Sequence, residues 1–552
     1  MIPRMARTPA LSTVLRYASE LRPSDGVAWC DTEFATSADP WLLSLRCFAE
    51  SLAQDFRASA ASAALALSLA RDDESVAFAR IASAWAMSGG FTHYRDNELR
   101  TAVDYLPLLR GVDRDRRVFA GYLLAEAALA CGQLNVAAEV VALVEEESDD
   151  FLLGDDGSQH PYLPMMRVMR ARLAGFQGRV TEALAIVESI RTVQGSAGEL
   201  LVLATSCLLR GNNAQRQSVR QLADRLQREL GEPDDYISAG CYILVSYGLI
   251  AMSEIPRAAE FVLRAGGDAD LAGLNVVDRA LGLEMLSVAA LAEGDLDAAQ
   301  AWRLRAEPLL VNPISAPTIE RIYSRVALAE GDAAAAAEWA QSAVRHARSQ
   351  GRAIEAAEGE IVLSRARVAL SERGLASAGL EQMAAHAADS GHLAAQKSAA
   401  RELRAIGRRL RPVPGSGWNG LSDRERDVAM LIAEGFGNQA IAMELHLSEH
   451  TVQAHVSRVL AAFGAASRLM VAAQLTGLLP TDPDAEPPAE LTPRQRMVAA
   501  QIANGRTNDA IAIELGVSVK TVEKHVTEIL RRWKVASRIG IARLAIALAD
   551  GN

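Results

Sequence analysis

A repeated pattern of paired apolar stretches constrains the fold of most of this chain. Between about residues 72 and 400, an apolar-periodic stretch ends at a small residue, and an Ala-rich stretch then follows. Because glycine tolerates the left-handed conformation that ends a helix, each junction predicts two helices joined by a tight turn. The junction residues are Gly132, Gly178, Gly211, Ser253, Gly294, Gly331 and Gly374.

Successive junctions are 33 to 46 residues apart, and alanines such as Ala137, Ala258 and Ala299 follow them on the second stretch. The pattern resembles tetratricopeptide-type repeats, in which helical pairs of about 34 residues stack into a solenoid. The resemblance implies an all-α architecture and carries no ligand. A compact helical bundle is the alternative, because the same periodicity permits it. Residues 1–70 also predict helices, with a loop around residues 31–40.

Composition supports helices and a reducing compartment. Ala and Leu dominate the hydrophobic half of the 552 residues, which favours helix over sheet. No stretch approaches about 20 uninterrupted apolar residues, and the first 21 residues lack the apolar core of a signal peptide. The cysteines form no C-x-x-C pair, which argues against a disulfide framework or structural zinc. They are Cys30, Cys47, Cys131, Cys207 and Cys241. We therefore expect a cytoplasmic protein with no membrane contact, bound metal or cofactor.

The net charge of -11 is unevenly distributed along the chain. Residues 401–552 hold 19 basic and 16 acidic residues, a net charge of +3, whereas residues 1–400 carry -14. A large acidic body joined to a mildly basic end is typical of a regulator with a separate binding end. Residues 401–418 form a basic helix end followed by a Pro/Gly/Ser linker, which indicates a solvated interdomain joint or an accessory phosphate contact.

Residues 421–468 and 491–538 are two copies of one sequence. A shift of 70 residues aligns them without a gap, and 23 of the 48 positions are identical. Each copy predicts four short helices, with a capping box at the start of the first and a three-residue turn between the second and third. A helix, a tight turn and a helix of these lengths form a helix-turn-helix, whose second helix enters the major groove of DNA.

The expected boundaries are equivalent in the two copies. The capping boxes are Ser422 with Glu425 and Thr492 with Gln495; the first helices end at Gly435 and Gly505; the second helices span 438–445 and 508–515. The N-caps of the third helices are Ser448 and Ser518, and those of the fourth helices are Ser467 and Ser537.

Three linked motifs, N-x-x-I-A-x-x-L, S-x-x-T-V-x-x-H and a closing S-R, occur in both copies. With them, each copy resembles the LuxR-type (GerE-like) helix-turn-helix of bacterial transcription regulators. The resemblance covers about 100 residues and implies a sequence-specific DNA-binding regulator. Large regulators of this type also carry a nucleotide-binding domain, but no G-x-x-x-x-G-K-[ST] motif occurs here. We expect no enzymatic activity, because no phosphate loop, nucleophile elbow or metal-spaced His/Cys cluster occurs either.

The resemblance also implies which side chains contact DNA. The third helix of the family usually reads T-V-K-x-H, in which the Lys position and the next reach base edges and Thr and His contact the backbone. The Lys position is Gln453 in copy one, which would pair with adenine, and Glu523 in copy two, which would accept from cytosine. The expected DNA-binding residues are Asn508, Ser518, Lys520, Thr521, Glu523, Lys524, His525, Thr527 and Arg531 in copy two, and Asn438, Ser448, His450, Thr451, Gln453, His455 and Arg458 in copy one.

The two copies differ in charge and are joined by an acidic, Pro-rich linker. Copy two holds nine basic and four acidic residues and copy one holds four and six, so copy two should anchor the protein on DNA. The linker, residues 480–490, could span roughly 34 Å as polyproline II, close to one helical turn of DNA. One chain would then read two successive major grooves. Alternatively, copy one pairs with copy one of a second chain through the apolar stripe Leu469, Val471, Ala472 and Leu475.

We therefore expect a helical-repeat sensor or interaction region at residues 1–405, a first helix-turn-helix domain at 417–479, the linker at 480–490 and a second helix-turn-helix domain at 491–552. Double-stranded DNA is the expected partner. RNA polymerase, a small-molecule or protein effector on the repeats, and a second copy of the chain are further candidates. The competing hypothesis is a solenoid interaction scaffold with degenerate helix-turn-helix modules, which the acidity of copy one favours.

Overall fold

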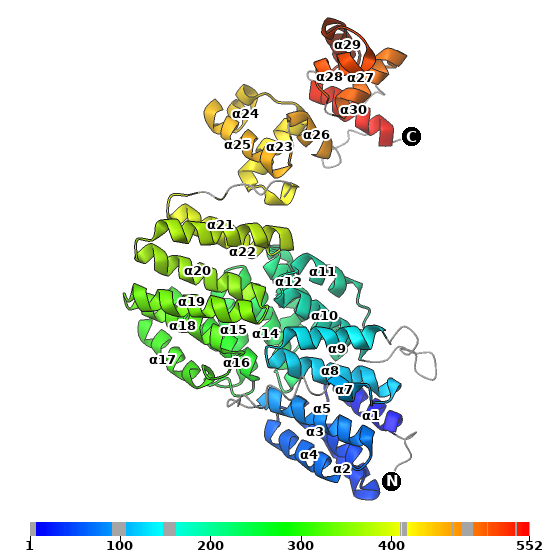
Figure 1. Cartoon of the computed structure of the whole chain (residues 1–552), viewed down its shortest axis with the longest axis vertical. Helices are drawn as coiled ribbons and strands as arrows, with labels where there is room; N and C mark the ends of the chain where they lie inside the picture. The colour runs from blue at the N-terminus through cyan, green and yellow to red at the C-terminus, as the bar shows by residue number, and fades with distance from the viewer. Residues whose placement is uncertain are drawn as a thin grey trace. The chain divides into compact units, whose positions relative to one another are not determined.

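The computed structural model describes residues 7–90, 106–146, 162–408, 410, 417–465, 467–475, 489–504, 506–535 and 538–550. Helices and turns make up these ranges, and none of the residues within them forms a strand. The all-α fold expected from the sequence is confirmed. The chain divides into two compact units, Met1–Arg409 and Leu410–Asn552, each with its own core (Figure 1).

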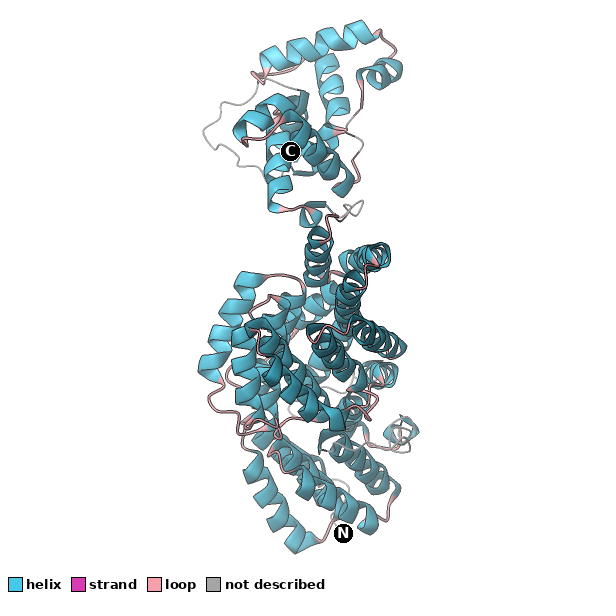
Figure 2. Ribbon diagram, turned by 90° about the vertical axis from the view of Figure 1, so that its left-hand side faces the viewer, coloured by secondary structure: helices cyan, strands magenta, loops and turns pink. Residues whose placement is uncertain are grey.

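The first unit is a stack of helices, and short turns join most of the helices whose connections the structure describes (Figures 1 and 2). Its first half comprises α1 (Arg7–Ser19), α2 (Pro23–Ser37), α3 (Pro40–Leu52), α4 (Phe56–Leu69), α5 (Asp73–Gly90), α7 (Leu106–Leu109), α8 (Arg114–Ala130), α9 (Leu134–Glu146), α10 (Leu163–Phe176) and α11 (Val180–Ser189). Its second half comprises α12 (Ala197–Asn212), α13 (Arg216–Glu229), α14 (Tyr236–Ala251), α15 (Ile255–Gly266), α16 (Val276–Glu293), α17 (Leu296–Ala306), the 3₁₀ turn η2 (Glu307–Leu309), α18 (Ala316–Ala329), α19 (Ala333–Ser349), α20 (Ala353–Ala369), α21 (Arg373–Ser390) and α22 (Leu393–Ala405).

The helices pack pairwise along the chain, which confirms the tetratricopeptide-like solenoid. Each helix contacts the next, and many also contact the next but one, as in a stack of helical hairpins. Ala137, Ala258 and Ala299 are fully buried on the second helices of their pairs, where their small side chains permit close packing.

The solenoid also closes on itself. Helices α1, α3 and α5 contact α12, α14 and α16 respectively, and α10 and α12 contact α20 and α22. The Asn213 side-chain amide donates to the Gly391 carbonyl at 2.9 Å, which joins positions 178 residues apart. One apolar cluster consequently includes residues from Ala10 to Ala394, and its aromatic centre includes an edge-to-face contact of Phe48 with Phe119 at 4.8 Å.

Five of the seven expected junction residues adopt positive φ and end a helix as expected: Gly132, Gly178, Ser253, Gly294 and Gly331. The prediction is wrong for the other two junction residues. Gly211 lies inside α12, and the turn after α12 uses Ala214 (φ 63°). Gly374 lies inside α21, and the turn before α21 uses Ser371 (φ 66°).

Gly211 serves helix packing instead of a turn. A Cβ on Gly211 would lie 2.6 Å from the Gly248 Cα of α14, and one on Gly248 would lie 2.5 Å from the Cys207 carbonyl oxygen of α12. The two glycines therefore let α12 and α14 pack backbone to backbone. The loop expected around residues 31–40 is also wrong, since α2 continues to Ser37 and only two residues separate it from α3.

The second unit holds two four-helix modules, as expected. Module one comprises the 3₁₀ turn η3 (Gly417–Gly420), α23 (Asp423–Glu434), α24 (Asn438–Glu444), α25 (Glu449–Ala462) and α26 (Arg468–Leu475). Module two comprises α27 (Pro493–Ala503), α28 (Asn508–Leu515), α29 (Val519–Arg532) and α30 (Arg538–Asp550). Gly505, Ser537 and most of the linker, residues 480–488, lie outside the described residues.

Candidate nucleic-acid interface

The first helix of each module begins at the expected capping box. The Ser422 hydroxyl accepts from the Glu425 amide at 3.3 Å, and the Glu425 carboxylate accepts from the Ser422 amide at 3.0 Å. Thr492 and Gln495 make the same two bonds at the start of α27. These reciprocal bonds satisfy backbone donors that would otherwise lack partners, and they fix where each module starts.

An arginine then ties the first helix to the helix-turn-helix turn. The Arg424 guanidinium donates to the Leu445 carbonyl at the end of α24, and Arg494 donates to the Leu515 carbonyl at 2.5 Å. Both side chains are half-buried. Arg424 and Arg494 add to the net charge of their modules, but the guanidinium group of each donates to a backbone carbonyl of its own module.

The closing S-R motif supplies a second clamp in each module. The Arg468 guanidinium donates to the Asn438 side-chain oxygen and to the Phe436 carbonyl. Arg538 makes the equivalent bonds to Asn508 and to the Arg506 carbonyl. The start of the second helix is thus fixed to the start of the fourth. Asn438 and Asn508, which the sequence predicts to contact DNA, therefore also stabilise their own modules.

The third helices, α25 and α29, are capped as expected. The Ser448 hydroxyl accepts from the Thr451 amide, and the Ser518 hydroxyl accepts from the Thr521 amide, each at 3.1 Å. Each serine and threonine also share a hydroxyl hydrogen bond of 2.8 Å. Val452, like its equivalent in module two, is fully buried and belongs to the core.

The expected contact residues mostly lie on one exposed face of each third helix. In module two, Thr521, His525 and Asn508 are half-buried, and the exposed side chains are Ser518, Lys520, Glu523, Lys524, Thr527 and Arg531. In module one, Ser448, His450 and Gln453 are exposed, whereas Asn438, Thr451, His455 and Arg458 are half-buried. Sequence reasoning missed Ser457, which is exposed and equivalent to Thr527; the 70-residue shift already pointed to it. Both hydroxyls donate to the carbonyl four residues earlier.

The two faces differ in available positive charge. Lys520 and Lys524 are exposed on α29, and neither forms an ion pair with another described residue, whereas Arg531 pairs with Glu528 at 2.6 Å. The only Lys or Arg on α25 is Arg458, which pairs with Glu425 at 2.9 Å.

Glu425 is itself held in the ionised form. Burial would raise its pKa, but bonds from the Ser422 backbone and from Arg458 lower it overall. The positive charge of Arg458 is therefore offset inside module one, and the exposed face of α25 carries no free cation.

The two modules pack on each other through their fourth helices. Leu469 of α26 belongs to the core cluster of module two, and Ile539 of α30, at the equivalent position, packs against the clusters of both modules. Equivalent residues thus occupy the interface from both sides, the arrangement expected of an approximate two-fold axis. The other members of the predicted stripe, Val471, Ala472 and Leu475, are buried in the core of module one, so they cannot form a surface for a second chain.

No group of three or more His, Cys, Asp or Glu residues suited to a metal ion occurs among the described residues. Within the same ranges, no helix is both long and apolar enough to cross a membrane. The five cysteines are all buried.

Comparison with known proteins matches the modules to one family. The family model of bacterial regulatory proteins of the luxR family (GerE) matches residues 419–475 and 489–545. An HTH-type transcriptional regulator of Mycobacterium bovis is 45% identical over 65 residues, which are 12% of this chain and 7% of that protein. The transcriptional regulatory protein YhcZ of Bacillus subtilis is 42% identical over 65 residues, 12% of this chain and 30% of YhcZ.

The chain therefore spans less than a third of the length of the curated relatives it matches. Among solved structures, the APC/C hetero-tetramer Cut9–Hcn1 aligns with 73% of this chain and 95% of its own, at 13% identity and a TM-score of 0.23. The capping boxes, the two arginine clamps and the family match agree on the same residues. Residues 419–475 and 489–545 are therefore two tandem LuxR-type (GerE-like) helix-turn-helix modules, and they follow a region of stacked helical hairpins.

Proposed function

We propose that this protein is a sequence-specific DNA-binding transcription regulator. The observation that carries the proposal is the exposed face of α29, where Lys520, Glu523, Lys524 and Thr527 surround a capped helix N-terminus. Such a face suits the major groove, because lysines neutralise phosphates while polar side chains reach base edges. The names of the relatives, which are transcriptional regulators, support the same function.

We further propose that one chain reads two half-sites. Leu469 and Ile539, at equivalent positions of the two fourth helices, both lie in the contact between the modules, and a two-fold relation of this kind would suit an inverted repeat in the DNA. Half-sites about one helical turn apart, 34–36 Å, are the usual spacing for paired helix-turn-helix units. In this proposal α29 supplies most of the affinity, and α25 adds sequence preference through Gln453.

The helical-repeat region would bind an effector or a partner protein and control oligomerisation. Its closed stack brings side chains from distant repeats together, so one ligand could contact several repeats at once. RNA polymerase is a candidate partner for a regulator of this kind.

Footprinting tests the two-module proposal on the full chain with DNA sequences selected from the chromosome. We expect one chain per site and protection of about two helical turns. Leu469→Glu places a charge in the interface and should shorten or divide the footprint, whereas Leu375→Glu, at a position 57% exposed in the helical region, should not. Protection of a single half-site, or a requirement for two chains per site, would contradict the proposal.

A protein-interaction scaffold is the second candidate, favoured by the lack of an exposed Lys or Arg on α25. Binding to mixed genomic fragments at two salt concentrations separates the two functions. A regulator shows salt-dependent basal affinity and enriches particular fragments, whereas a scaffold does neither.

A further inference from the structure

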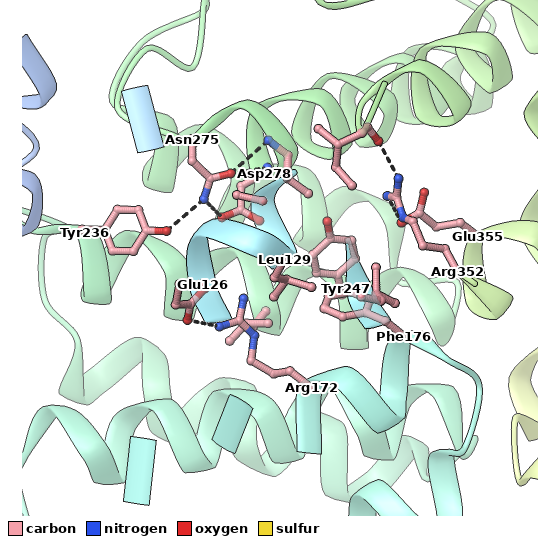
Figure 3. A pocket seen from close by; sticks show the side chains of 15 residues that line it. Glu126, Leu129, Arg172, Phe176, Tyr236, Tyr247, Asn275, Asp278, Arg352 and Glu355 are labelled. Atoms are coloured by element: carbon pink, nitrogen blue, oxygen red, sulfur yellow. Dashed lines mark hydrogen bonds and ion pairs between the residues drawn. The ribbon is translucent and has the colours of Figure 1, made fainter. Parts of the chain in front are cut away.

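A cavity with charged and apolar walls lies inside the helical-repeat unit, lined by side chains of α8, α9, α10, α14, α16 and α20 (Figure 3). Glu126 comes from α8, Arg172 from α10, Tyr236 and Tyr247 from α14, and Asp278 from α16. Apolar side chains, among them Leu129, Phe176 and Leu244, complete the lining. The cavity volume is about 50 Å³, which at 10–15 Å³ per molecule holds about three to five waters.

Asn275 fixes the polar side of this cavity. As the N-cap of α16, it accepts from the Val277 and Asp278 amides at 3.0 and 2.9 Å. Its side-chain amide donates to the Asp278 carboxylate at 2.7 Å and to the Tyr236 hydroxyl at 3.2 Å (Figure 3). The orientation of the Asp278 carboxylate therefore follows from the cap that starts the helix.

The other charges around the cavity are paired. Arg172 donates to Glu126 at 2.5 Å, and Arg352 binds Glu355 and also donates to the Ile314 carbonyl. Asp278 has no ion pair with any described residue. Three carboxyl groups and two guanidinium groups thus line the cavity, and Asp278 supplies the charge that is not balanced.

A second lining group also lacks a partner. The Tyr247 hydroxyl is buried and forms no hydrogen bond with any residue that the structure describes. A buried polar group without a partner costs stability, and bound ligands commonly supply the missing bond. The rings of Tyr236, Tyr247 and Phe176 add π faces, which attract cations in a desolvated site.

We propose that this cavity binds a small protonated amine, with the ammonium group at Asp278 and Tyr247 and a short apolar chain against Leu129, Phe176 and Leu244. The ammonium would donate to the Asp278 carboxylate and to the Tyr247 oxygen. The volume admits about four non-hydrogen atoms, the size of n-propylammonium. The inference deepens the proposed effector role of the helical-repeat region.

The proposal includes a dependence on pH. Burial raises the pKa of Asp278 to about 6, against the opposing effects of Arg172 and the Asn275 bond, and Glu126 raises it further. The other titratable or charged side chains facing the cavity are Tyr236, Tyr247, Arg352 and Glu355. An ammonium ion needs the ionised carboxylate, so binding is lost as the pH falls through about 6. We expect affinity about tenfold higher at pH 7.5 than at pH 5.

Titration calorimetry on the full chain without DNA tests the site, with n-propylammonium as the probe, 1-propanol as its neutral isostere and propionate as an anion. We expect binding of the amine alone. Asp278→Asn keeps the shape of the side chain and should weaken binding at least tenfold, and Tyr247→Phe should weaken it severalfold. Asp297→Asn, an exposed first-turn aspartate of α17, is the matched control and should bind as the unmodified chain does.

Thermal unfolding of each variant confirms that it is folded. Equal binding by Asp278→Asn, preference for propionate, or binding of 1-propanol as tight as that of the amine would overturn the proposal. Because no DNA is present, failure here leaves the DNA-binding proposal intact, and failure to bind DNA leaves this measurement unaffected.

Discussion

Removal of the Lys524 side chain tests whether module two dominates DNA affinity. Lys520 and Lys524 are exposed on α29 and pair with no described residue, whereas the one arginine of α25 is held by Glu425. Lys524→Ala therefore removes one of the two exposed, unpaired lysines on α25 and α29. The equivalent position in α25 is Ala454, which allows the reciprocal change, Ala454→Lys.

The expected magnitude follows from counterion release. Each phosphate that a cation neutralises contributes about 0.9 to the slope of log K against log salt concentration. Two lysines then predict a loss in affinity of about 12-fold between 50 and 200 mM salt, and one lysine predicts about 3.5-fold. Lys524→Ala should lower the slope by about 0.9, and Ala454→Lys should raise it by about the same amount.

Fluorescence anisotropy on one operator fragment at several salt concentrations measures both slopes. Gln453→Ala and His455→Ala, in module one, should weaken binding less than Lys524→Ala or His525→Ala. Equal losses in the two modules, or a slope that Lys524→Ala leaves unchanged, would refute the reasoning from exposed charge.

Two further predictions concern the helical-repeat region. Gly248→Ala places a Cβ 2.5 Å from the Cys207 carbonyl and should lower the free energy of unfolding by about 1–3 kcal/mol. Gly240→Ala, on the same helix with open space around it, should not lower it. Thermal unfolding compares the two variants, and equal midpoints would contradict the close-packing role of Gly248. A fragment of residues 415–552 should bind DNA no worse than the full chain at low salt, because it lacks residues 1–414, whose net charge is -10. Markedly weaker binding by the fragment in a gel-shift assay would indicate that the helical region aids binding through dimerisation.

Local features of the fold could be predicted from the sequence because they depend on neighbouring residues. The capping box of Ser422 and Glu425 and the Ser518 N-cap use groups three residues apart, so the sequence alone indicates them. The prediction for Gly211 is wrong because its role depends on a distant residue. A glycine near the end of an Ala- and Leu-rich stretch suggests a turn, and only the partner helix, which brings Gly248 against it, reveals its packing role.

Long-range features could not be predicted in this way. Glu126 and Asp278 line one cavity although 152 residues separate them, and no periodic pattern joins such positions. The contact of Leu469 with module two could not be predicted either. An apolar residue on a short helix is compatible with burial in its own core, with a contact to another module of the chain or with a contact to a second chain. The charges of the two modules were visible in the sequence, but the neutralisation of Arg458 by Glu425 depends on side-chain geometry.

The closure of the solenoid affects how the protein is made on the ribosome. Helix α1 contacts α12, and α12 is complete only at residue 212, so translation must add about 190 residues after α1 before this contact can form. At about 5–20 residues per second, synthesis of that length takes about 10–40 s. During this interval the part of α1 that packs against α12 has no partner within the nascent chain. The N-terminal repeats thus complete their packing well after they are synthesised, whereas the two C-terminal modules are synthesised in one short segment.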